Sequence, residues 1–492
     1  MSSNYEIVIG LEVHTQLATR SKLFSTAPVV YGAPPNHSVS PVCLGLPGVL
    51  PVLNARAVEL AIRTALALHC KVHTRSVFAR KNYFYPDLPK GYQISQYEEP
   101  IATGGYLEIE TESAQGEMHS KRIGITRVHM EEDAGKSIHD AASGAGNGSL
   151  VDLNRAGVPL LEIVSEPDLR SPEEARAYLR SLRSLLRYIE VSEADMEKGQ
   201  FRCDANISLR TAGAPRLGTR TELKNLNSFR FVEGALRAEI ERQAGILDAG
   251  GTVQQATLAY DPASRRTRVL RLKENADDYR YFPDPDLVPL VFDDEKVESV
   301  RANLPELPAQ KLARFEQQYE LSEYDARLLT ANRSLADFFE ASVVEYGQPK
   351  PVANWILRDL LQLLNTRDVD IEALALTPAL LAQLIRLVDA GRVTARHARE
   401  LFPELAERGG DPAVLIRERG LEAVSDGGLL ERTADEVIAA HPDSVERYKN
   451  GEEKLLNFLM GQVMQRTQGK ANPQAIRELL ARKLTRIIHE TP

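Results

Sequence analysis

The chain has 492 residues, of which 43% are hydrophobic, and a formal net charge of -9. At roughly one domain per 150 residues, this length predicts a globular protein of two to four domains with substantial cores. The acidic balance excludes a surface that binds nucleic acid everywhere by attraction to phosphates, so any RNA contact must be local.

Three cysteines occur, Cys43, Cys70 and Cys203, and none belongs to a Cys-x-x-Cys pair. The sequence therefore encodes neither a disulfide framework nor a thiolate zinc site, and a reducing cytoplasm fits it best. The N-terminus lacks a basic segment followed by a long apolar run, and no stretch approaches the roughly 20 apolar residues of a membrane span. We expect neither export nor membrane anchoring.

Residues 1–293 mix short alternating strands, Gly/Pro turns and a few amphipathic helices, which predicts an α+β domain built on a mixed or antiparallel sheet. One helix is expected at 55–69 with Asn54 as its cap. Another is expected after Ser171-Pro172, where Glu174 completes a capping box. The expected strands are 6–15, 121–130, 159–164 and 202–210.

The pattern changes near Pro289, and from about Asn303 the chain is almost wholly helical by period. Thr377-Pro378 opens one helix and Gly391 closes it. The clearest linker is 409–412, because two glycines and a proline next to an acidic cap cannot continue a helix. The predicted domains are 1–293, 294–410 and 411–492.

The first candidate site residues are Glu12 and His14, which a strand period of two places on one face of a very apolar segment. A carboxylate and an imidazole side by side there cost several kcal/mol unless they are paired or bind a cation. A metal or phosphate site is one interpretation. A pair satisfied by neighbouring backbone or by an arginine is the other.

Two further strands carry polar residues that a core would not. Asp204, Asn206 and Ser208 alternate with apolar residues and so share one face. The alternative for this face is the outward side of a half-exposed antiparallel sheet. Glu162 interrupts the run 160–164, which otherwise predicts a fully buried strand, and we group it with Glu12.

Another predicted strand ends in three consecutive acids, Glu131, Glu132 and Asp133. Alternation separates Glu132 from the other two, so at most one set points into any one cavity. Taken alone, such a run could be a solvated turn. The following Gly-Lys is not a P-loop, since the Walker spacing requires a glycine where Met130 stands.

Carboxylates on different strands would provide hard oxygen ligands suited to Mg²⁺ rather than to zinc. An acidic floor with a basic rim is what phosphoryl transfer requires, because positioning and charge neutralisation supply nearly all of its catalysis. The pattern thus indicates ATP. The proposed floor is Glu12, His14, Glu132, Glu162 and Asp204, and the basic partners are Lys81, Arg220 and Lys224.

Several segments resemble the B subunits of the three-subunit tRNA-dependent amidotransferases. The segments are GLEVHTQL from Gly10, LGLPGVLPVLN from Leu44, RKNYFYPDLPKGYQISQ from Arg80, RVHMEEDAGKS from Arg127, SLVDLNRAGVPLLEIVSEPD from Ser149, FRCDANISLR from Phe201, RTELKNLNS from Arg220, DDYRYFPDPD from Asp277 and GKANPQ from Gly469. The resemblance covers essentially the whole chain. It favours the bacterial type over the archaeal paralogue, because no large insert precedes the helical half.

The resemblance implies a cradle domain at 1–293 with a sheet like those of glutamine synthetase and guanido kinases. A helical domain and a small tail at 411–492, similar to YqeY proteins, would follow. It also implies a heterotrimer, in which an amidase A subunit releases ammonia from glutamine and a small C subunit joins A to B. The B subunit would use ATP to phosphorylate the Asp or Glu esterified to tRNA and pass the acyl phosphate to ammonia. An aminoacyl-tRNA synthetase is a further candidate partner.

By the same resemblance, Glu12, His14, Glu132 and Glu162 would contact Mg²⁺ directly or through water. Asp204 and Asn206 would be further ligands of Mg²⁺–ATP. The remaining predicted nucleotide contacts are Arg220, Lys224 and Lys81.

One departure from the family pattern concerns zinc. Some members carry two Cys-x-x-Cys pairs early in the cradle, whereas here only Cys43 remains of the second pair and the first is absent. One thiolate cannot hold structural Zn²⁺ tetrahedrally. We therefore predict no zinc.

The tail locally reverses the acidic balance of the chain, which is expected of an RNA-binding surface. Solvated helix faces are the alternative, but the resemblance implies that this tail binds tRNA. The predicted tRNA-binding residues are Lys454, Arg466, Lys470, Arg477, Arg482 and Lys483.

Two other functions are compatible with parts of the pattern. A stand-alone ATP-dependent carboxylate–amine ligase would need its own ammonia source, yet no amidase signature or evident nucleophilic cysteine is present. A non-catalytic tRNA-binding scaffold would be expected to have lost some of the acids, and it has not. Whether Asp-tRNA, Glu-tRNA or both are used does not follow from the sequence.

Overall fold

The computed structural model describes residues 4–112, 116–138, 148–272, 279–367, 369–423 and 427–490. The chain divides into two compact units, Met1–Leu307 and Pro308–Pro492. The first is built on a large mixed sheet and the second on helices, as the sequence predicts for the two halves. No helix in these ranges is both long and apolar enough to cross a membrane.

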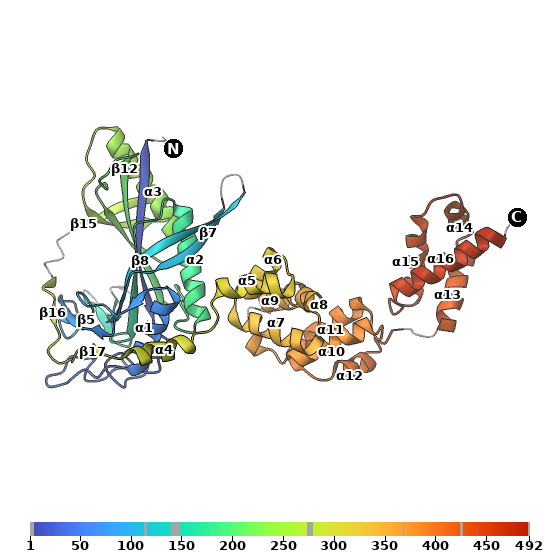
Figure 1. Cartoon of the computed structure of the whole chain (residues 1–492), viewed down its shortest axis with the longest axis horizontal. Coiled ribbons are helices and arrows are strands. Elements are labelled where there is room, and N and C mark those ends of the chain that lie inside the picture. Colours follow the sequence, from blue (N-terminus) through green and yellow to red (C-terminus); the bar gives the residue numbers. More distant parts are fainter. Residues whose placement is uncertain are drawn as a thin grey trace. The chain divides into compact units, whose positions relative to one another are not determined.

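Thirteen of the described strands form the large sheet of the first unit (Figure 1). Its main path is β15-β14-β13-β12-β1-β11-β8-β5-β4-β16, and β2, β6 and β7 join beside β8. The path pairs are antiparallel except β13 with β14, which is parallel. The strands are β1 (Tyr5–Gln16), β2 (Lys71–Val72), β4 (Ala79–Asn82), β5 (Tyr92–Ser95), β6 (Ala102–Thr103), β7 (Tyr106–Glu112), β8 (Met118–Glu132), β11 (Pro159–Ser165), β12 (Phe201–Thr211), β13 (Thr221–Leu226), β14 (Ala256–Asp261), β15 (Arg266–Leu272) and β16 (Phe282–Pro283).

The predicted strands at 6–15, 121–130, 159–164 and 202–210 correspond to β1, β8, β11 and β12. Side chains along each strand alternate between two faces. In β1, Ile9, Leu11 and Val13 are buried in the main core, while Glu12 and His14 lie on the other face. The fold thereby separates an apolar face from a polar one.

Three helices that contact the strands of the sheet belong to the same core as its apolar face. They are α1 (Ala55–Ala67), α2 (Pro172–Tyr188) and α3 (Phe229–Asp248). α1 contacts β8, α2 contacts β7, and α3 contacts β12, β13 and β15. Together with the apolar sheet residues they enclose the largest hydrophobic cluster of the first unit. The opposite face of the central strands is left to line a cavity.

The predicted helix caps are present, with one difference. Asn54 accepts from the N–H groups of Arg56 and Ala57, and Ser171 accepts from the N–H of Glu174. A reciprocal capping box would have Glu174 accept from the N–H of Ser171. Its carboxylate instead accepts from the N–H of Arg170 at 2.8 Å. The glutamate therefore secures the loop that enters the helix rather than the cap residue itself.

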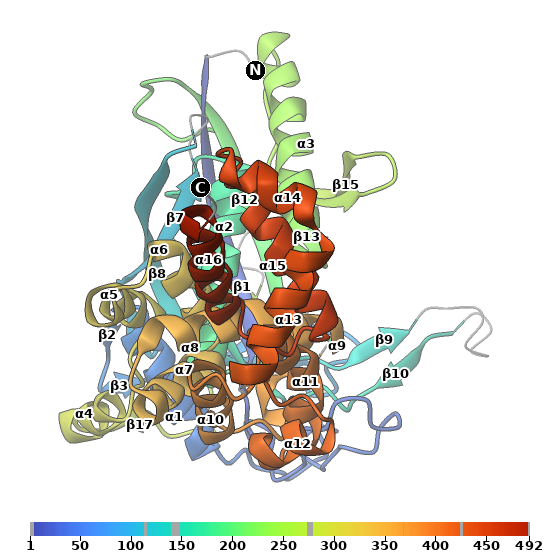
Figure 2. The ribbon, with the colours of Figure 1, turned by 90° about the vertical axis from the view of Figure 1, so that its right-hand side faces the viewer.

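The rest of the first unit is peripheral to the sheet. Strands β9 (Lys136–Ile138) and β10 (Leu150–Asp152) form a two-stranded ribbon (Figure 2). Strands β3 (Arg75–Ser76) and β17 (Leu290–Val291) form another. Helix α4 (Asp294–Ala302) contacts α1.

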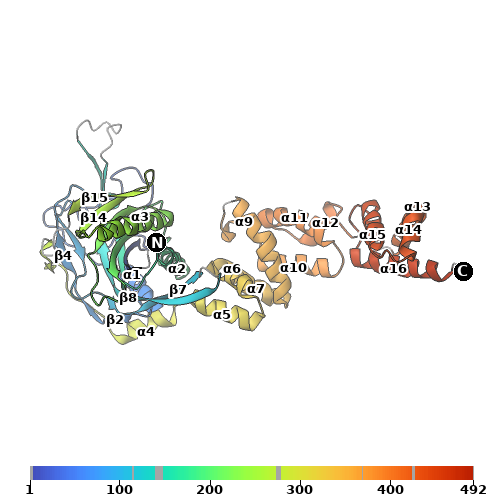
Figure 3. The same ribbon diagram turned by 90° about the horizontal axis from the view of Figure 1, so that it is seen from above.

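The second unit contains two hydrophobic clusters, 315–416 and 430–484. In the second cluster, α15 contacts both α13 and α16 (Figure 3). The elements are α5 (Pro308–Tyr319), α6 (Glu323–Thr330), α7 (Arg333–Tyr346), α8 (Pro349–Trp355), the π-helix η3 (Ile356–Leu360), α9 (Leu361–Arg367), the 3-10 helix η4 (Ile371–Ala373), α10 (Pro378–Asp389), α11 (Ala395–Arg408), α12 (Pro412–Glu418), α13 (Gly427–Ala440), α14 (Pro442–Lys449), α15 (Leu455–Arg466) and α16 (Pro473–Glu490).

Packing differs from the predicted domain boundaries at two places. Val297 and Val300 of α4 belong to the core of the first unit, which runs past residue 293. Ile416 of α12 packs with the first helical cluster, although it lies beyond the linker at Gly409 and Gly410. The three-domain division itself stays a prediction.

Asn54 provides a test of how the first helix is anchored. Its Oδ1 caps α1, and its Nδ2 donates to the carbonyl oxygens of Ser21 and Lys22 at 3.1 and 3.3 Å. We expect Asn54→Ala to lower the free energy of unfolding by about 1–2 kcal/mol, as for other lost caps. Asn54→Asp keeps the capping oxygen but not the donors, so its loss should be smaller. Urea unfolding followed by circular dichroism measures both, and equal losses would contradict a capping role.

Candidate active site

The polar face of the central strands forms a cavity of about 1470 Å³. Residues from β1, β4, β5, β8, β11, β12 and β13 line it. Of the predicted site residues, it brings together Glu12, His14, Lys81, Glu162, Asp204, Arg220 and Lys224. Side chains from positions more than two hundred residues apart therefore share one space, as the sequence analysis requires.

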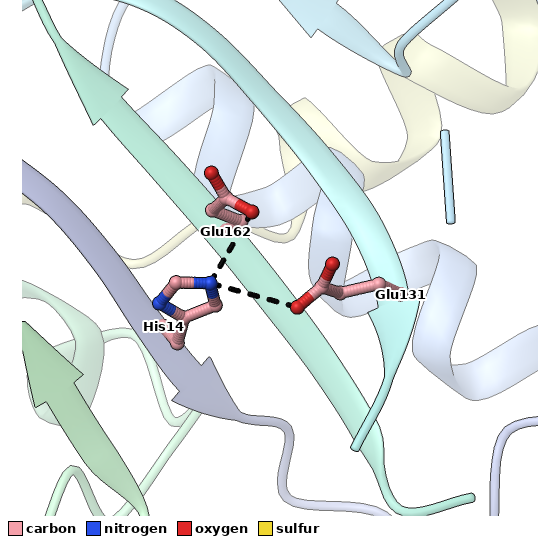
Figure 4. Close-up of side chains that lie close together, drawn as sticks. All are labelled: His14, Glu131 and Glu162. Atoms are coloured by element: carbon pink, nitrogen blue, oxygen red, sulfur yellow. Dashed lines mark ion pairs between the residues drawn. The ribbon is translucent and has the colours of Figure 1, made fainter. Parts of the chain in front are cut away.

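Strand register creates a row of ionisable groups across the middle of the sheet. His14 of β1 lies opposite Glu162 of β11, and Glu162 lies opposite His129 of β8. The Nε2 atoms of both histidines are 3.2 Å from Glu162 Oε2. Glu131 adds a carboxylate 3.6 Å from His14 Nε2 (Figure 4). Three strands thus supply a compact group of two carboxylates and two imidazoles.

Burial makes the charges in this group interdependent. Burial alone would lower the pKa of His14, but the carboxylates of Glu162 and Glu131 raise it to about 9. Burial opposes ionisation of Glu162, but the neighbouring His129 and His14 bring its pKa well below the usual range. Without a bound cation, the protonated imidazole of His14 and the ammonium group of Lys81 both help to compensate the two carboxylates.

Glu132 is a predicted site residue that the structure does not place in the cavity. Its carboxylate pairs with Lys90 and accepts from the N–H of Ile94 at 3.0 Å. The physical reason is alternation along β8, which puts Glu132 on the side of Met130 and turns Glu131 and Asp133 into the cavity. In the candidate site, Glu131 therefore replaces Glu132.

A second group of charges lies on β12 and β13, next to the first. Glu12 faces Asp204 across the β1–β12 pair. Lys224 donates to Asp204 at 2.6 Å and lies 3.2 Å from Glu222. Against the effect of burial, these two carboxylates raise the pKa of Lys224. Its ammonium group is therefore charged at neutral pH and is held between the two carboxylates.

Asn206 does not line this cavity but an adjoining pocket of about 210 Å³, which shares Glu12, Val164 and Arg220 with it. Its Nδ2 donates to Glu12 at 2.8 Å, and its Oδ1 is buried without a hydrogen-bond partner among the described residues. Burial, followed by the charges of Glu162 and Glu222, raises the pKa of Glu12. Asn206 counteracts this by hydrogen bonding to the charged form. It supports a ligand of the cavity and also presents an unused acceptor.

The donor set of the central row fits a divalent cation. Ligand atoms of His14, Glu131 and Glu162 all lie within 4.8 Å of one another. Carboxylate oxygens suit Mg²⁺ or Mn²⁺, and an imidazole contacts such an ion directly or through water. A cation would also neutralise the carboxylates that otherwise depend on a proton at His14.

Sequence reasoning missed several functional candidates for one reason. Glu131, His129, Asp133 and Glu222 all face the cavity, but each depends on which strand face points inward. Asp133 pairs with Arg202 at 2.9 Å and accepts from Gln16 Nε2 at 2.9 Å. The alternation between Glu131 and Glu132 was visible in the sequence, but nothing there identified the inner set.

Cys43, the cysteine that the sequence analysis compared with a Cys-x-x-Cys pair, is surrounded by a lysine and two serines. The buried Lys22 donates to Cys43 Sγ at 3.3 Å and to the carbonyl oxygen of Leu153 at 3.2 Å. Hydroxyls of Ser25 and Ser40 lie 3.8 and 3.2 Å from the same sulfur. Although burial opposes it, these hydrogen bonds and the Lys22 charge lower the pKa of the thiol.

The predicted tRNA-binding residues lie on α15, α16 and the segments that flank them. Lys454, Arg466, Arg477 and Arg482 are exposed. Two of the set are in ion pairs with α13: Arg466 with Glu436 at 3.1 Å, and Lys483 with Asp435 at 2.7 Å. Lys470 is half-buried.

The fold and the site define a class of protein in which a mixed-sheet unit carries an acidic cavity with donors suited to a divalent cation, and a helical region follows. Comparison with family models identifies the particular class. Residues 7–298 match the GatB/GatE catalytic domain, and residues 337–484 match the GatB domain that is associated with YqeY. The chain belongs to the GatB/GatE family.

Curated relatives match over nearly the full length. They include proteins of Nitratidesulfovibrio vulgaris (54% identical), Geotalea daltonii (52%) and Thermosynechococcus vestitus (51%). Each match covers 98% of this chain and between 97% and 100% of the relative. All three relatives are named as the B subunit of aspartyl/glutamyl-tRNA(Asn/Gln) amidotransferase.

The assignment of the inner carboxylate on β8 can be tested with a matched pair of variants. We expect Glu131→Gln to weaken Mg²⁺ or Mn²⁺ binding by at least about 10-fold, because it removes a charged oxygen from the central group. Glu132→Gln should bind the ion as the wild type does, because that side chain lies on the other face. Isothermal titration calorimetry measures both affinities, after thermal unfolding has shown that both variants fold. If Glu132→Gln weakened ion binding more than Glu131→Gln, Glu132 rather than Glu131 would belong to the site.

The prediction of no zinc has its own test. Cys43 offers one thiolate, and the ammonium group of Lys22 lies beside it. The purified chain should therefore contain far less than one equivalent of zinc by elemental analysis. Refolding in excess Zn²⁺ should not raise its unfolding temperature. Stoichiometric zinc retained through chelator treatment would refute the prediction.

Proposed function

We propose that this chain is the B subunit of a tRNA-dependent amidotransferase, in which it activates the side-chain carboxylate of Asp or Glu misacylated onto tRNA. The observation that carries the proposal is the convergence of His14, Glu131 and Glu162 in one cavity that Lys224 also lines. The names of the full-length relatives support the same reaction. In enzyme terms the complex is a carbon–nitrogen ligase that uses glutamine as the nitrogen donor.

The chemistry explains why activation is needed. A carboxylate does not react with ammonia, because it is anionic and its leaving group would be oxide. One carboxylate oxygen attacks the γ-phosphorus of ATP, the bond to the β-phosphate oxygen breaks, and ADP leaves. Ammonia then attacks the acyl carbon, inorganic phosphate departs, and a proton passes to solvent. The product is the amide on the same tRNA.

The side chains divide this work by position. His14, Glu131 and Glu162, with Glu12 and Asp204 beside them, would hold Mg²⁺, which neutralises phosphate charge during transfer. Lys224 and Arg220 on the β12–β13 side would contact the phosphates of ATP, with Asn206 orienting Glu12. Lys81 enters from β4, and its pKa is raised against burial by Glu131 among others. Its ammonium is suited to the acyl phosphate oxygens.

The family and its printed names extend the proposal to partners. Ammonia would come from an amidase A subunit, with a small C subunit completing a heterotrimer in the cytoplasm, where aminoacyl-tRNA is made. An aminoacyl-tRNA synthetase is a further candidate partner. The tail would bind the tRNA through Lys454, Arg466, Lys470, Arg477, Arg482 and Lys483.

A stand-alone carboxylate–amine ligase is the alternative enzyme. That protein would release ammonia from glutamine without partners, which the isolated chain should fail to do. A non-catalytic scaffold is the other alternative, and it would form no ADP in the assembled complex.

Replacement of cavity acids should stop phosphorylation specifically. We expect Glu12→Ala and Asp204→Ala, each assembled with A and C subunits, to reduce ADP formation with misacylated tRNA by at least about 100-fold, since both lie beside the phosphate-binding groups. Glutaminase activity of the A subunit should remain measurable.

Glu108→Ala is a matched control, because this exposed carboxylate of β7 pairs with Arg122 at 2.8 Å outside the cavity. It should leave ADP formation unchanged. Unaffected ADP release in Glu12→Ala and Asp204→Ala would refute the proposed site.

The tail can be tested through salt dependence. Arg477 and Arg482 are exposed on α16, and removing one arginine that binds a phosphate should lower the salt slope of tRNA binding by about one. We expect Arg477→Ala with Arg482→Ala to weaken tRNA binding without changing the KM for ATP. Filter binding from low to high salt measures the slope, and an unchanged slope would exclude these two residues from the interface.

A further inference from the structure

One side of the cavity carries tyrosines that the phosphoryl-transfer chemistry does not use. Tyr83 and Tyr85 follow β4, Tyr97 follows β5, and Tyr279 and Tyr281 precede β16. These five residues are called the aromatic wall. Tyr97 and Tyr281 stack with ring centroids 4.0 Å apart and an interplanar angle of 6°. The others meet edge to face at 6.0 to 6.3 Å.

The aromatic wall extends from the interior of the cavity to its mouth. Tyr83, Tyr279 and Tyr281 are half-buried, whereas Tyr85 is 62% exposed. Phe84, which also lines the cavity, is 80% exposed. Its ring lies against Gly91, where a Cβ would come within 3.1 Å of it and φ is +77°. Exposing large rings to water is unfavourable, so a row of them is expected to have a ligand.

Positively charged side chains accompany the rings. Lys81 Nζ lies 4.9 Å from the centroid of the Tyr279 ring, and the Arg127 guanidinium lies 5.7 Å from that of Tyr97. Arg280 also lines the cavity between the two tyrosines of the final segment. Stacking surfaces interleaved with positive groups are characteristic of sites for single-stranded nucleic acid, where rings take the bases and cations take the phosphates.

The position of the wall relates it to the reacting groups. In the sheet order, β5, β4 and β16 lie beyond β8, whereas β12 and β13 lie on the other side of β1. The central row of His14, Glu162 and Glu131 therefore lies between the aromatic wall and Lys224. A ligand held on the wall and a phosphate held at Lys224 would approach the central row from opposite sides.

We propose that the aromatic wall binds the unpaired 3′ end of the tRNA acceptor, with its terminal adenosine stacked against the Tyr97–Tyr281 pair. This assignment rests on the proposed function, because it presumes that the carboxylate to be activated is esterified to that adenosine. Adenine could also come from ATP. A mononucleotide offers one base, whereas several rings from the interior to the mouth match the successive bases of a strand that leaves the cavity. The wall is a positioning surface and takes no part in bond making.

The test separates the two sources of adenine by kinetics of the assembled heterotrimer. Tyr281→Ala should raise the KM for misacylated tRNA by about 5- to 100-fold, the loss of stacking on one base, while the KM for ATP stays constant. Tyr281→Phe keeps the ring and should restore the KM for tRNA. Tyr97→Ala, which breaks the same pair from the other strand, should repeat the effect of Tyr281→Ala.

Tyr106→Ala is the matched control. Tyr106 stacks on His69 with centroids 4.4 Å apart, but it lies on β7 and does not line the cavity. Neither KM should change in this variant. Thermal unfolding of each variant shows whether a changed KM is due to a loss of stability alone. Tyr85→Ala removes an exposed ring of the aromatic wall without disturbing the core, so its KM for tRNA is measured as well.

A binding cycle tests the contact without turnover. Deacylated tRNA and the same tRNA lacking its terminal adenosine are titrated into wild-type and Tyr281→Ala heterotrimer. The truncated tRNA should bind the wild type about 5- to 100-fold more weakly, and the variant should bind both tRNAs alike.

Three outcomes would overturn the assignment. If Tyr281→Ala and Tyr97→Ala raised only the KM for ATP, the aromatic wall would bind the adenine of ATP instead. If neither Tyr281→Ala nor Tyr97→Ala changed the KM for tRNA or for ATP, the rings would have a structural role only. Equal discrimination between the two tRNAs by wild type and Tyr281→Ala would place the adenosine elsewhere. Failure of the proposed function is distinguishable, because the wild type itself would then form no ADP with misacylated tRNA.

Discussion

The antiparallel register of β1, β11 and β8 is the constraint on which the rest of the site depends. It sets His14 opposite Glu162 and Glu162 opposite His129. The Cβ atoms of residues that face each other in this way are about 5 Å apart. A shift of one residue in any of these strands would turn its ionisable groups into the apolar core, where unpaired charges are prohibitively costly. The hydrophobic face that α1, α2 and α3 cover therefore also fixes the geometry of the polar face.

The charged side chains that line the cavity compensate one another. Lys224 pairs with Asp204, Arg202 pairs with Asp133, and a protonated His14 compensates Glu162 and Glu131. Each pair keeps a buried charge from being uncompensated in the absence of ligand. Under the proposed function, a bound cation and bound phosphates would take the place of these internal partners, so that no isolated charge would first have to be exposed. Such an arrangement suits a reaction that works by positioning and charge neutralisation.

The fold also separates functions in space. The side chains proposed to bind phosphates lie on the β12–β13 side, the group proposed to bind the cation is central, and aromatic rings lie next to β4, β5 and β16. The helical unit has its own hydrophobic clusters and presents basic residues on α15 and α16. This division fits the proposal that the first unit carries out the chemistry and that the basic residues of the second bind the tRNA.

The sequence alone indicated four central strands, the first helices and most members of the candidate site. Apolar alternation predicted β1, β8, β11 and β12, and capping residues predicted α1 and α2. Ionisable residues within apolar strands pointed to Glu12, His14 and Glu162, and an alternating polar face pointed to Asp204, because these signals are local. Only the tertiary structure decided which face of β8 turns inward, and so selected Glu131 over Glu132 and added His129. It also decided that tyrosines from three separate segments form one wall. Strand pairing and sidedness arise from contacts between distant segments, which spacing within one segment does not specify.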